Sequence, residues 1–229
     1  MPELRSVAET GSTNDDLAAL AEAGAPEGLW LRADRQSGGK GRQGRAWQSP
    51  PGNLHASTLV RLRPGDPPAP TLALVAAVAL HEAVRPEAPT ARIKWPNDLL
   101  VEGAKLAGIL LERQGDAVVI GFGVNLALHP DLPDRPATSL EALAGRAPGP
   151  HAFLTRLAPI FEVWIGRWRG EGLDPVRTAW AAAAHPPGTP IATGDARGAF
   201  DGLDESGALR LRLADGQIKV INAGDVFLI

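Results

Sequence analysis

The 229-residue chain contains no cysteine, which excludes a disulfide framework and thiolate chemistry. No stretch approaches the roughly 18 uninterrupted apolar residues of a membrane-spanning helix, and the N-terminal segment lacks the apolar core of a secretory signal. The five histidines lack metal-ligand spacing, and no Ser-His-Asp arrangement is recognisable. A net charge of −3 argues against bulk nucleic-acid binding. These absences predict a soluble, unexported, cytoplasmic protein.

Lysine is also scarce, since only four of the 23 basic residues are lysines: Lys40, Lys94, Lys105 and Lys219. An ammonium group is compact and its pKa is readily tuned, whereas a guanidinium is always charged and planar. A chain that uses arginine so freely keeps lysine where a compact cation is wanted. Biased codon usage would explain the ratio as well, but it does not place individual lysines.

The most distinctive segment is a basic, glycine-rich loop. Four glycines fall within the seven residues 38–44, and Lys40, Arg42 and Arg45 stand among or just after them. No Asp or Glu occurs between residues 35 and 63. Glycine lets the backbone approach a ligand closely, and cations among glycines indicate an anionic guest. The segment therefore predicts a loop that closes over a phosphate-bearing ligand.

Three other interpretations of this loop compete. Residues 39–44 match the G-x-G-x-x-G spelling of a dinucleotide-binding turn, but the following 47–52 contains two prolines and cannot be a helix. The acidic residue that such a turn needs further along is also missing. A Walker A loop would require Lys and then Ser or Thr after the second glycine, and Arg45-Ala46 stands there instead. The third interpretation, that this is only a solvated, mobile basic loop, remains possible from the sequence.

Hydrophobic periodicity, turn residues and prolines place the remaining elements. Strands are expected at 4–8, 28–33, 53–62, 90–95, 99–101, 105–114 and 117–126, and helices at 15–23, 71–84, 139–144, 151–169 and 173–184. Trp164 and Trp168 belong to the core of one helix, and His81 is an ordinary helix residue. From Thr189 onward, short strands alternate with Gly/Asp turns such as Gly194-Asp195. We expect two domains, 1–186 and 187–229, the second small and all-β.

Two further patterns indicate a ligand groove. The two strands of the expected hairpin contain Gly108, Gly121 and Gly123. A single glycine in a strand is explained by a bulge, but three on neighbouring strands favour a surface on which a ligand lies flat. The segment Ser12-Thr-Asn14 opens a helix, where N-capping explains it equally well. The same geometry places hydroxyl and N–H groups where small polar ligands bind.

No activated nucleophile stands out, so the residues suit chemistry by positioning and electrostatic stabilisation. Activation of a carboxylate by ATP is such a reaction, because two anions must be brought together and charge builds on pyrophosphate. Cations from a closing loop, together with Mg²⁺, offset that repulsion. A closed loop also excludes water and protects an acyl-adenylate from hydrolysis.

Five segments in order resemble the biotin protein ligase family: Ser12–Asn14, Gln36–Trp47, Lys94-Trp-Pro-Asn-Asp98, Lys105-Leu-Ala-Gly-Ile109 and Gly121-Phe-Gly-Val-Asn125. The resemblance runs from about residue 4 to the end and includes Trp180. It implies an α+β fold like the class II aminoacyl-tRNA synthetases, with a mixed, mostly antiparallel sheet flanked by helices and then a small SH3-like β-barrel. It also implies a ligase that converts biotin and MgATP into biotinyl-5′-AMP and biotinylates a lysine of a biotin carboxyl carrier protein.

The resemblance also implies roles for individual residues. Lys105, Arg42 and Asp98 are expected to be catalytic, with Asp98 orienting or deprotonating the acceptor lysine. The expected biotin-binding residues are Ser12, Thr13, Asn14, Gln36, Lys40, Gly41, Arg42, Lys105, Gly108 and Gly123, with Gly121 beside them. The expected ATP-binding residues are Arg42, Arg45, Trp47, Lys94, Asn97, Lys105 and Asn125, with Trp95 nearby. No protein ligand is assigned to a metal, and Mg²⁺ is expected to enter with ATP.

The chain departs from the family pattern in two respects. Lys40 and Gln43 stand where many bacterial members have arginine, which removes planar guanidinium groups from the loop. The chain also starts at the catalytic domain, without the winged-helix domain of repressor-type members, so we expect no DNA binding and no operon regulation. A homodimer is implied by resemblance alone.

Three other functions compete with this one. A lipoate-protein ligase shares the fold and the adenylation chemistry, although Gln36, Ser12 and Thr13 suit a polar ureido ring better than a dithiolane. A non-catalytic biotin- or carrier-binding protein would not need both Lys105 and Asp98. A single-stranded nucleic-acid binder would need basic residues and stacking aromatics on the C-terminal module, which has five Asp and one Glu and few aromatic residues.

Overall fold

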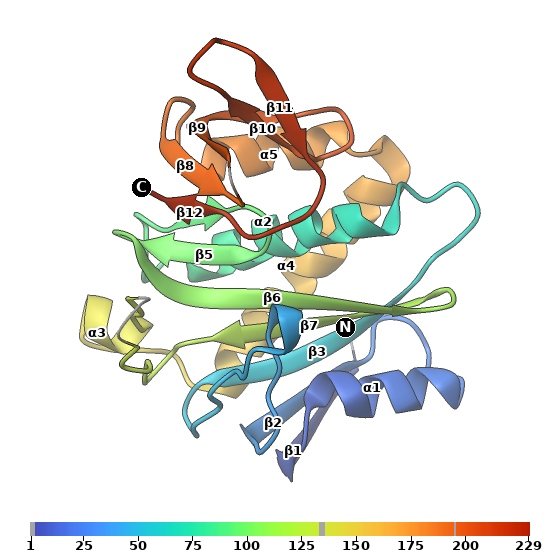
Figure 1. The fold of residues 1–229 in the computed structure, drawn as a ribbon. Helices are drawn as coiled ribbons and strands as arrows, with labels where there is room; N and C mark the ends of the chain where they lie inside the picture. The colour runs from blue at the N-terminus through green and yellow to red at the C-terminus, as the bar shows by residue number, and fades with distance from the viewer. Residues whose placement is uncertain (1–2, 133–135, 195) are drawn as a thin grey trace.

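The computed structural model describes residues 3–132, 136–194 and 196–229 and contains a seven-stranded and a five-stranded sheet (Figure 1). The strands of the larger sheet are β1 (Leu4–Thr10), β2 (Trp30–Gln36), β3 (Leu54–Arg61), β4 (Arg92–Lys94), β5 (Asp98–Val101), β6 (Ala104–Gln114) and β7 (Ala117–Val124). Their order is β1-β2-β3-β7-β6-β5-β4, and only β1 and β2 pair in parallel within the described part of this sheet. The expected mixed, mostly antiparallel sheet is therefore confirmed.

One face of this sheet is covered by a group of helices. The helices of the chain are α1 (Thr13–Glu22), α2 (Leu72–Val84), α3 (Leu140–Ala144), α4 (Pro150–Glu171) and α5 (Asp174–Ala183), with short 3₁₀ turns η1 (Arg42–Gly44) and η2 (Ala69–Thr71). Helices α2, α4 and α5 pack on one another behind the sheet (Figure 1). Trp164 and Trp168 of α4 are buried there, as predicted, and Trp168 Nε1 donates to Thr71 Oγ1 over 2.8 Å. No helix of the described residues is long and apolar enough to cross a membrane.

The opposite face is covered only in part, by α1. Under this helix, Leu59 of β3 lies opposite Val119 of β7, and both pack against Leu17 of α1. Side chains two residues apart along a strand point to the same face. On β7, the next two residues that point to this face are therefore Gly121 and Gly123. They lie beyond the start of α1, which does not cover them. This change from large apolar residues to glycine leaves the second half of the face open.

Helix α1 begins at Thr13, two residues before the expected start, with Ser12 in the extended conformation of an N-cap. The Ser12 side chain makes no capping hydrogen bond. The capping explanation of Ser12 is therefore not realised by its hydroxyl. Ser12, Thr13 and Asn14 are nevertheless buried, at 3%, 3% and 4% exposure, at the edge of the open half of the sheet.

The C-terminal residues form the expected small all-β unit. Its strands are β8 (Pro190–Thr193), β9 (Ala196–Leu203), β10 (Leu209–Arg212), β11 (Ile218–Ile221) and β12 (Phe227–Leu228), in the antiparallel order β11-β10-β9-β8-β12. Of the expected Gly194-Asp195 turn, Asp195 lies outside the described residues. Trp180 of α5 packs on Phe200 with ring centroids 6.1 Å apart, and Trp95 Nε1 donates to the carbonyl of Gly207 over 3.3 Å. These contacts fix the unit against the larger sheet.

Candidate active site

A cavity of about 680 Å³ occupies the open half of the larger sheet, a volume typical of small-molecule sites. Every site residue predicted from the sequence lines it: Ser12, Thr13, Asn14, Gln36, Lys40, Gly41, Arg42, Arg45, Trp47, Lys94, Asn97, Asp98, Lys105, Gly108, Gly123 and Asn125. Gly121 lines it too, whereas Trp95 is buried beside it. Segments more than 100 residues apart in sequence thus meet at one concave surface, and their roles there remain predictions.

Two lysines and one carboxylate form a cluster in the cavity wall. Asp98 Oδ1 lies 2.6 Å from Lys105 Nζ, and Asp98 Oδ2 lies 3.1 Å from Lys94 Nζ. The local fold explains the second pair, because β4 and β5 form a tight hairpin in which Lys94 and Asp98 are in register. Burial by itself would raise the pKa of Asp98, but the ammonium groups of Lys105 and Lys94 hold it below its usual value. The cluster therefore carries one excess positive charge when all three groups are ionised.

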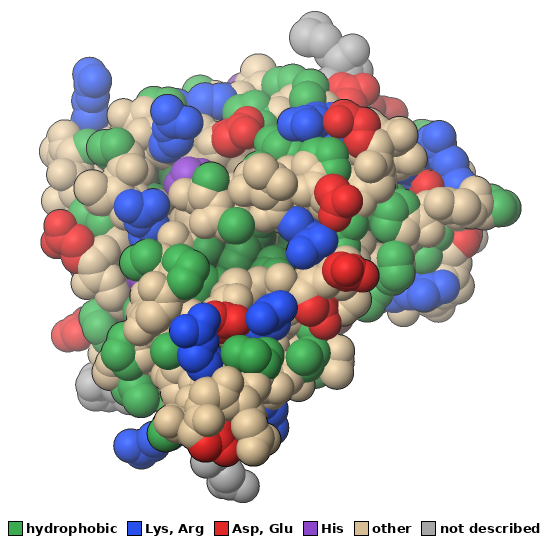
Figure 2. Space-filling model, turned by 90° about the horizontal axis from the view of Figure 1, so that it is seen from above, with side chains coloured by type: hydrophobic (Ala, Val, Ile, Leu, Met, Phe, Trp, Pro, Cys, Tyr) green, Lys and Arg blue, Asp and Glu red, His purple; other side chains and the backbone are tan. Residues whose placement is uncertain are grey.

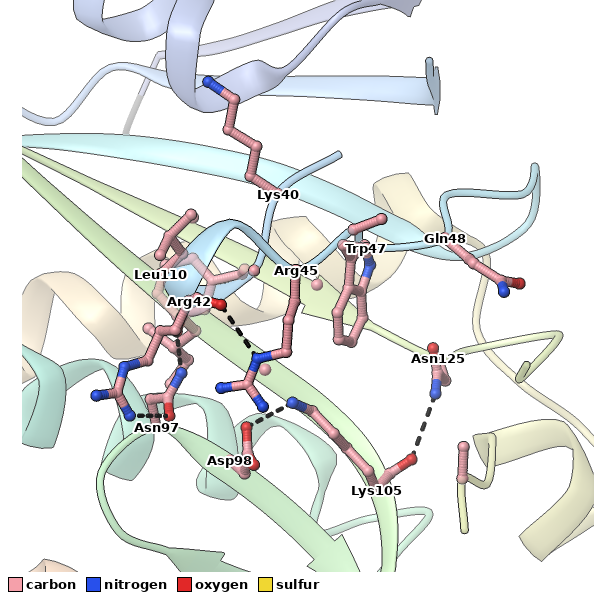
Figure 3. A pocket seen from close by; sticks show the side chains of 18 of the residues that line it. Lys40, Arg42, Arg45, Trp47, Gln48, Asn97, Asp98, Lys105, Leu110 and Asn125 are labelled. Carbon is pink, nitrogen blue, oxygen red and sulfur yellow. Dashed lines mark hydrogen bonds and ion pairs between the residues drawn. The ribbon is translucent and has the colours of Figure 1, made fainter. Parts of the chain in front are cut away.

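The turn that carries Asn97 is fastened to the neighbouring strand. Asn97 Nδ2 donates to the carbonyl of Ile109 over 2.6 Å, and the Ile109 amide donates back to the carbonyl of Asn97 over 2.9 Å. This reciprocal pair fixes the end of β5 against β6. Asp98 and Lys105 are thereby held on adjacent strands facing the same part of the cavity (Figure 3).

Trp47 lies across the glycines of the sheet. A Cβ atom at Gly123 would come within 2.5 Å of the indole ring, and one at Gly108 would come within 3.2 Å of both Trp47 and Lys105. Only glycine therefore permits this approach. Lys105 Nζ lies 5.4 Å from the centre of the Trp47 ring, in cation–π range. The glycines do make a flat surface, but in this structure the protein's own Trp47 rests on it.

The basic loop folds back on itself over the cavity. The Gly41 amide donates to the carbonyl of Arg45 over 2.7 Å, and the Trp47 amide donates to the carbonyl of Gly39 over 2.9 Å. Gln43 has a left-handed conformation with φ of 57°, which is uncommon for a residue with a side chain. The loop thus forms a hydrogen-bonded turn beside the cavity.

The two arginines of the loop reach the C-terminal unit. Arg45 Nη2 lies 2.7 Å from Asp225 Oδ2, and Arg42 Nη1 lies 3.5 Å from Asp225 Oδ1. Arg42 Nη1 also donates to the carbonyl of Gly224 over 3.2 Å and to Asn97 Oδ1 over 3.4 Å. Both guanidinium groups extend toward the side of the cavity that holds Asp98 and Lys105 (Figure 3).

Lys40 behaves differently from the arginines. Its ammonium lies 2.7 Å from Asp15 Oδ1 of α1, and both side chains are about half exposed, at 45% and 54%. Figure 3 shows it extending away from the Lys105 cluster. Lys40 therefore ties the loop to α1 from the rim of the cavity.

A network of hydrogen bonds that runs from buried side chains out to an exposed glutamate lines the α1 end of the cavity. Gln36 Oε1 accepts from the Thr13 amide over 2.8 Å and lies 3.0 Å from Thr13 Oγ1. The Thr13 and Ser57 hydroxyl oxygens are 2.7 Å apart, and Ser57 Oγ lies 2.6 Å from Asn14 Oδ1. Asn14 Nδ2 donates to Glu112 over 2.7 Å. This end is polar and preorganised, with donors and acceptors at fixed positions.

The Asn125 side chain joins two neighbouring backbone segments by hydrogen bonds. Its Nδ2 donates to the carbonyls of Thr138 over 3.1 Å and of Lys105 over 3.3 Å. The side chain is 3% exposed, so it holds the segment after β7 against β6 from below the cavity. This geometry fixes the backbone from which Lys105 projects.

The polar residues that sequence reasoning missed include His55 and Asp225, which line the cavity, and Ser57 and Glu112, which bond to residues that line it. His55 and Ser57 alternate with Leu59 along β3, so strand period could have placed them once the register with Gly121 and Gly123 was known. His55 is 1% exposed, and burial holds the pKa of its ring below the usual value. No local pattern marks Asp225, because it enters the site from the other sheet.

Comparison with known proteins gives consistent results for both parts of the chain. Residues 9–125 match the model of the biotin/lipoate A/B protein ligase family, and residues 191–229 match that of the biotin protein ligase C-terminal domain. The chain is 41% identical to the biotin–[acetyl-CoA-carboxylase] ligase of Paracoccus denitrificans, over 96% of this chain and 98% of that protein. It is 35% identical to the Mycobacterium tuberculosis protein of the same name, over 98% and 88%.

Solved structures agree with these relatives. The biotin protein ligase of Aquifex aeolicus in complex with biotin and ATP superposes with a TM-score of 0.89 at 24% identity, over 100% of both chains. The Leishmania major enzyme in complex with biotinyl-5-AMP superposes with a TM-score of 0.71 at 26% identity, over 97% of this chain and 100% of that one. The expected fold is thus confirmed over both units.

Proposed function

This chain belongs to the biotin protein ligase family, and from that premise we propose that it activates biotin with MgATP and then biotinylates one lysine of a carrier domain. The observation that best supports the proposal is the single cavity that joins a polar end, a flat glycine surface and a cationic cluster. These three parts match the ureido ring, the apolar body and the carboxylate of biotin in order. The acceptor proposed is a biotin carboxyl carrier domain of acetyl-CoA carboxylase.

The first step joins two anions. A biotin carboxylate oxygen attacks the α-phosphorus of ATP, the bond to the pyrophosphate oxygen breaks, and biotinyl-5′-AMP forms. Lys105, with Arg42 and Arg45 from the loop, would offset the charge that both reactants bring. Because the loop lines the cavity, it would also keep water from the mixed anhydride.

In the second step the neutral ε-amine of the acceptor lysine attacks the carbonyl carbon of the adenylate. The amide bond forms, AMP leaves with the electrons of the broken bond, and the proton of the amine passes to water. We propose that Asp98 orients Lys105 and Lys94 rather than taking this proton. A carboxylate whose pKa is held low by two ammonium groups is a weak base.

At the other end, Thr13, Gln36 and Ser12 would bind the ureido ring. The Thr13 amide already donates to Gln36 Oε1 at the cavity end, so little ordering is needed when the ligand enters. Gly108 and Gly123 would let the apolar part of biotin lie flat on the strands once Trp47, which rests on them in this structure, moves aside.

Mg²⁺ would enter bound to ATP. The described residues contain no group of three or more His, Asp or Glu side chains suited to holding a metal ion. The two carboxylates at this side of the cavity, Asp98 and Asp225, each have two cationic partners already. These residues do not build a metal site of their own, so the ion would be part of the substrate.

We further propose residues 1–186 as the catalytic domain and residues 187–229 as a module that contributes Asp225 to the loop. The cytoplasm is the proposed place of action, because MgATP and carboxylases are found there. A homodimer is a separate proposal, which sedimentation equilibrium at micromolar concentration tests.

ATP–pyrophosphate exchange tests the function, run in parallel with biotin and with lipoate. Exchange with biotin alone supports the proposal. Exchange with lipoate alone would keep the mechanism and reverse the substrate, an outcome that the C-terminal family match disfavours. Absence of exchange in folded protein that binds biotin would instead identify a non-catalytic binder.

A further inference from the structure

The exposed carboxylate of Glu112 on β6 is bonded to a buried amide. Asn14 Nδ2 donates to Glu112 Oε2 over 2.7 Å, and Asn14 is only 4% exposed. On its other side, Asn14 Oδ1 lies against Gly121 so closely that a Cβ at that position would collide with it. The amide is therefore held between β7 and the rim of the cavity, with Glu112 at its outer edge.

Glu112 determines which way the Asn14 amide faces. An ionised carboxylate has only acceptor oxygens, so the nitrogen of the amide must face it and the oxygen must face Ser57. Turning the amide over would place Asn14 Oδ1 against a carboxylate oxygen, with no proton between them. The observed 2.6 Å contact between Ser57 Oγ and Asn14 Oδ1 is then a bond in which Ser57 donates.

This orientation fixes the direction of a short chain of hydroxyl protons. Because Ser57 donates its one proton to Asn14, its contact of 2.7 Å with Thr13 requires Thr13 to be the donor. Thr13 Oγ1 could also donate to Gln36 Oε1, which lies 3.0 Å away, but the shorter contact with Ser57 takes its single proton. Gln36 Oε1 consequently accepts from the Thr13 amide alone and keeps one acceptor position free.

With the amide reversed, the chain would run the other way. Asn14 Nδ2 would donate to Ser57, Ser57 to Thr13, and Thr13 to Gln36 Oε1. Both acceptor positions of Gln36 Oε1 would be filled by Thr13, its amide and its hydroxyl. The cavity end would then lose its acceptor for an N–H group of a ligand.

We propose that Glu112 is a positioning residue that acts through Asn14, Ser57 and Thr13 to keep Gln36 Oε1 open for an N–H donor of the ligand. The inference rests on the proposed function, in which that donor is a ureido N–H of biotin. Glu112 itself need not touch the ligand. It selects cyclic ureas over isosteres that lack the N–H group.

Steady-state pyrophosphate exchange and calorimetric biotin binding test this with Glu112→Ala, Glu112→Gln and, as a matched control, Glu82→Ala, which removes an exposed glutamate of α2. For Glu112→Ala we expect the KM and Kd for biotin to rise roughly fivefold to twentyfold, as for a lost buried hydrogen bond. The KM for ATP and kcat should change less than about twofold. Glu112→Gln should restore most of the affinity, because its amide oxygen can still accept from Asn14.

Two further readouts separate positioning from a general structural effect. In a double-mutant cycle, Glu112→Ala combined with Asn14→Ala should bind biotin no more weakly than Asn14→Ala alone. Two cyclic carbamate analogues of biotin, in each of which oxygen replaces one ureido N–H, should be discriminated less by Glu112→Ala than by the unmodified protein.

Unchanged biotin affinity in Glu112→Ala, or fully additive effects in the cycle, would overturn the inference. The proposed function fails separately. An unmodified protein that neither exchanges pyrophosphate with biotin nor binds it refutes the function, and the inference with it. A protein that binds biotin without exchange refutes only catalysis, and the comparison of variants is then made on Kd.

Discussion

Lys105 Nζ lies 2.6 Å from Asp98 Oδ1, in a pair whose side chains are 30% and 13% exposed. Lys94 approaches the same carboxylate, at 3.1 Å, from the neighbouring strand. A carboxylate shared between two lysines holds both in place and neutralises only one of their two charges. The arrangement therefore presents a fixed cation to the cavity, which is what the joining of two anionic substrates requires.

Replacing Lys105 by Ala is expected to lower the rate of biotin adenylation about 100- to 1,000-fold, the range found when one stabilising donor of a transition state is lost. The fold should persist, because Lys94 remains as a partner for Asp98. Lys219→Ala, at an exposed lysine of β11, is the matched control. Single-turnover adenylate formation and thermal unfolding measure the two quantities, and an unchanged rate would remove Lys105 from the mechanism.

Replacing Arg42 by Gly is expected to release biotinyl-5′-AMP from the cavity and to biotinylate lysines indiscriminately. The guanidinium links the loop to Asn97 and to the carbonyl of Gly224, so its loss opens the cover and removes a cation from the phosphate. Avidin blotting of serum albumin incubated with enzyme, biotin and ATP measures the effect. Arg146→Gly, an exposed site, controls for loss of an arginine, and retained acceptor specificity in Arg42→Gly would refute the role.

Replacing Asp225 by Asn is expected to loosen the basic loop. This carboxylate lies 2.7 Å from Arg45 and 3.5 Å from Arg42, and an amide keeps its size but loses the charge. Limited trypsin digestion should cleave after Arg42 and Arg45 several-fold faster than in the unmodified protein. Asp215→Asn, in an exposed turn of the same unit, should digest at the original rate. Equal digestion of both variants would show that Asp225 does not hold the loop.

Stability is expected to fall as the pH is lowered from about 7.5 to 5. Burial holds the pKa of His55 and of His81 below the usual value, so both rings stay neutral in the folded state when the unfolded chain takes up protons. Their contribution is fully present above the unfolded pKa of about 6.5 and is lost as the pH falls through the folded values. Urea titrations at several pH values measure the slope, which His81→Gln should reduce. A slope unaffected by that change would rule out His81 as a source.

Much of the fold could be predicted because its signals are local. The apolar run that became α2, the Gly115-Asp116 turn between β6 and β7, and the Gly/Asp turns of the C-terminal unit are each carried by a short stretch of residues. Boundaries were less accurate. Helix α1 begins at Thr13 rather than Asp15, and α4 extends to Glu171 rather than Arg169, since neighbouring packing decides where a helix ends.

The residues of the cavity were also recognisable in sequence, but their partners were not. The segments around Lys94, Asp98 and Lys105 are short and specific, and each predicted member lines the cavity. Nothing in the sequence placed Asp225 beside Arg45, or Glu112 beside Asn14. These pairs are separated by 180 and 98 residues, and sequence patterns describe only neighbours along the chain.

The sequence by itself determined which chemical groups are available: the chain is rich in arginine, has no thiols, and has lysines at a few positions and glycines at points of close approach. The tertiary structure decided which of these groups act together. Strand register placed Gly121 beneath Asn14 and Gly123 beneath Trp47. The packing of the second sheet brought the Asp225 carboxylate to Arg45 of the basic loop. Contacts between distant segments form only when all strands of the sheet are paired in the correct register. They are therefore a property of the fold and not of any one segment.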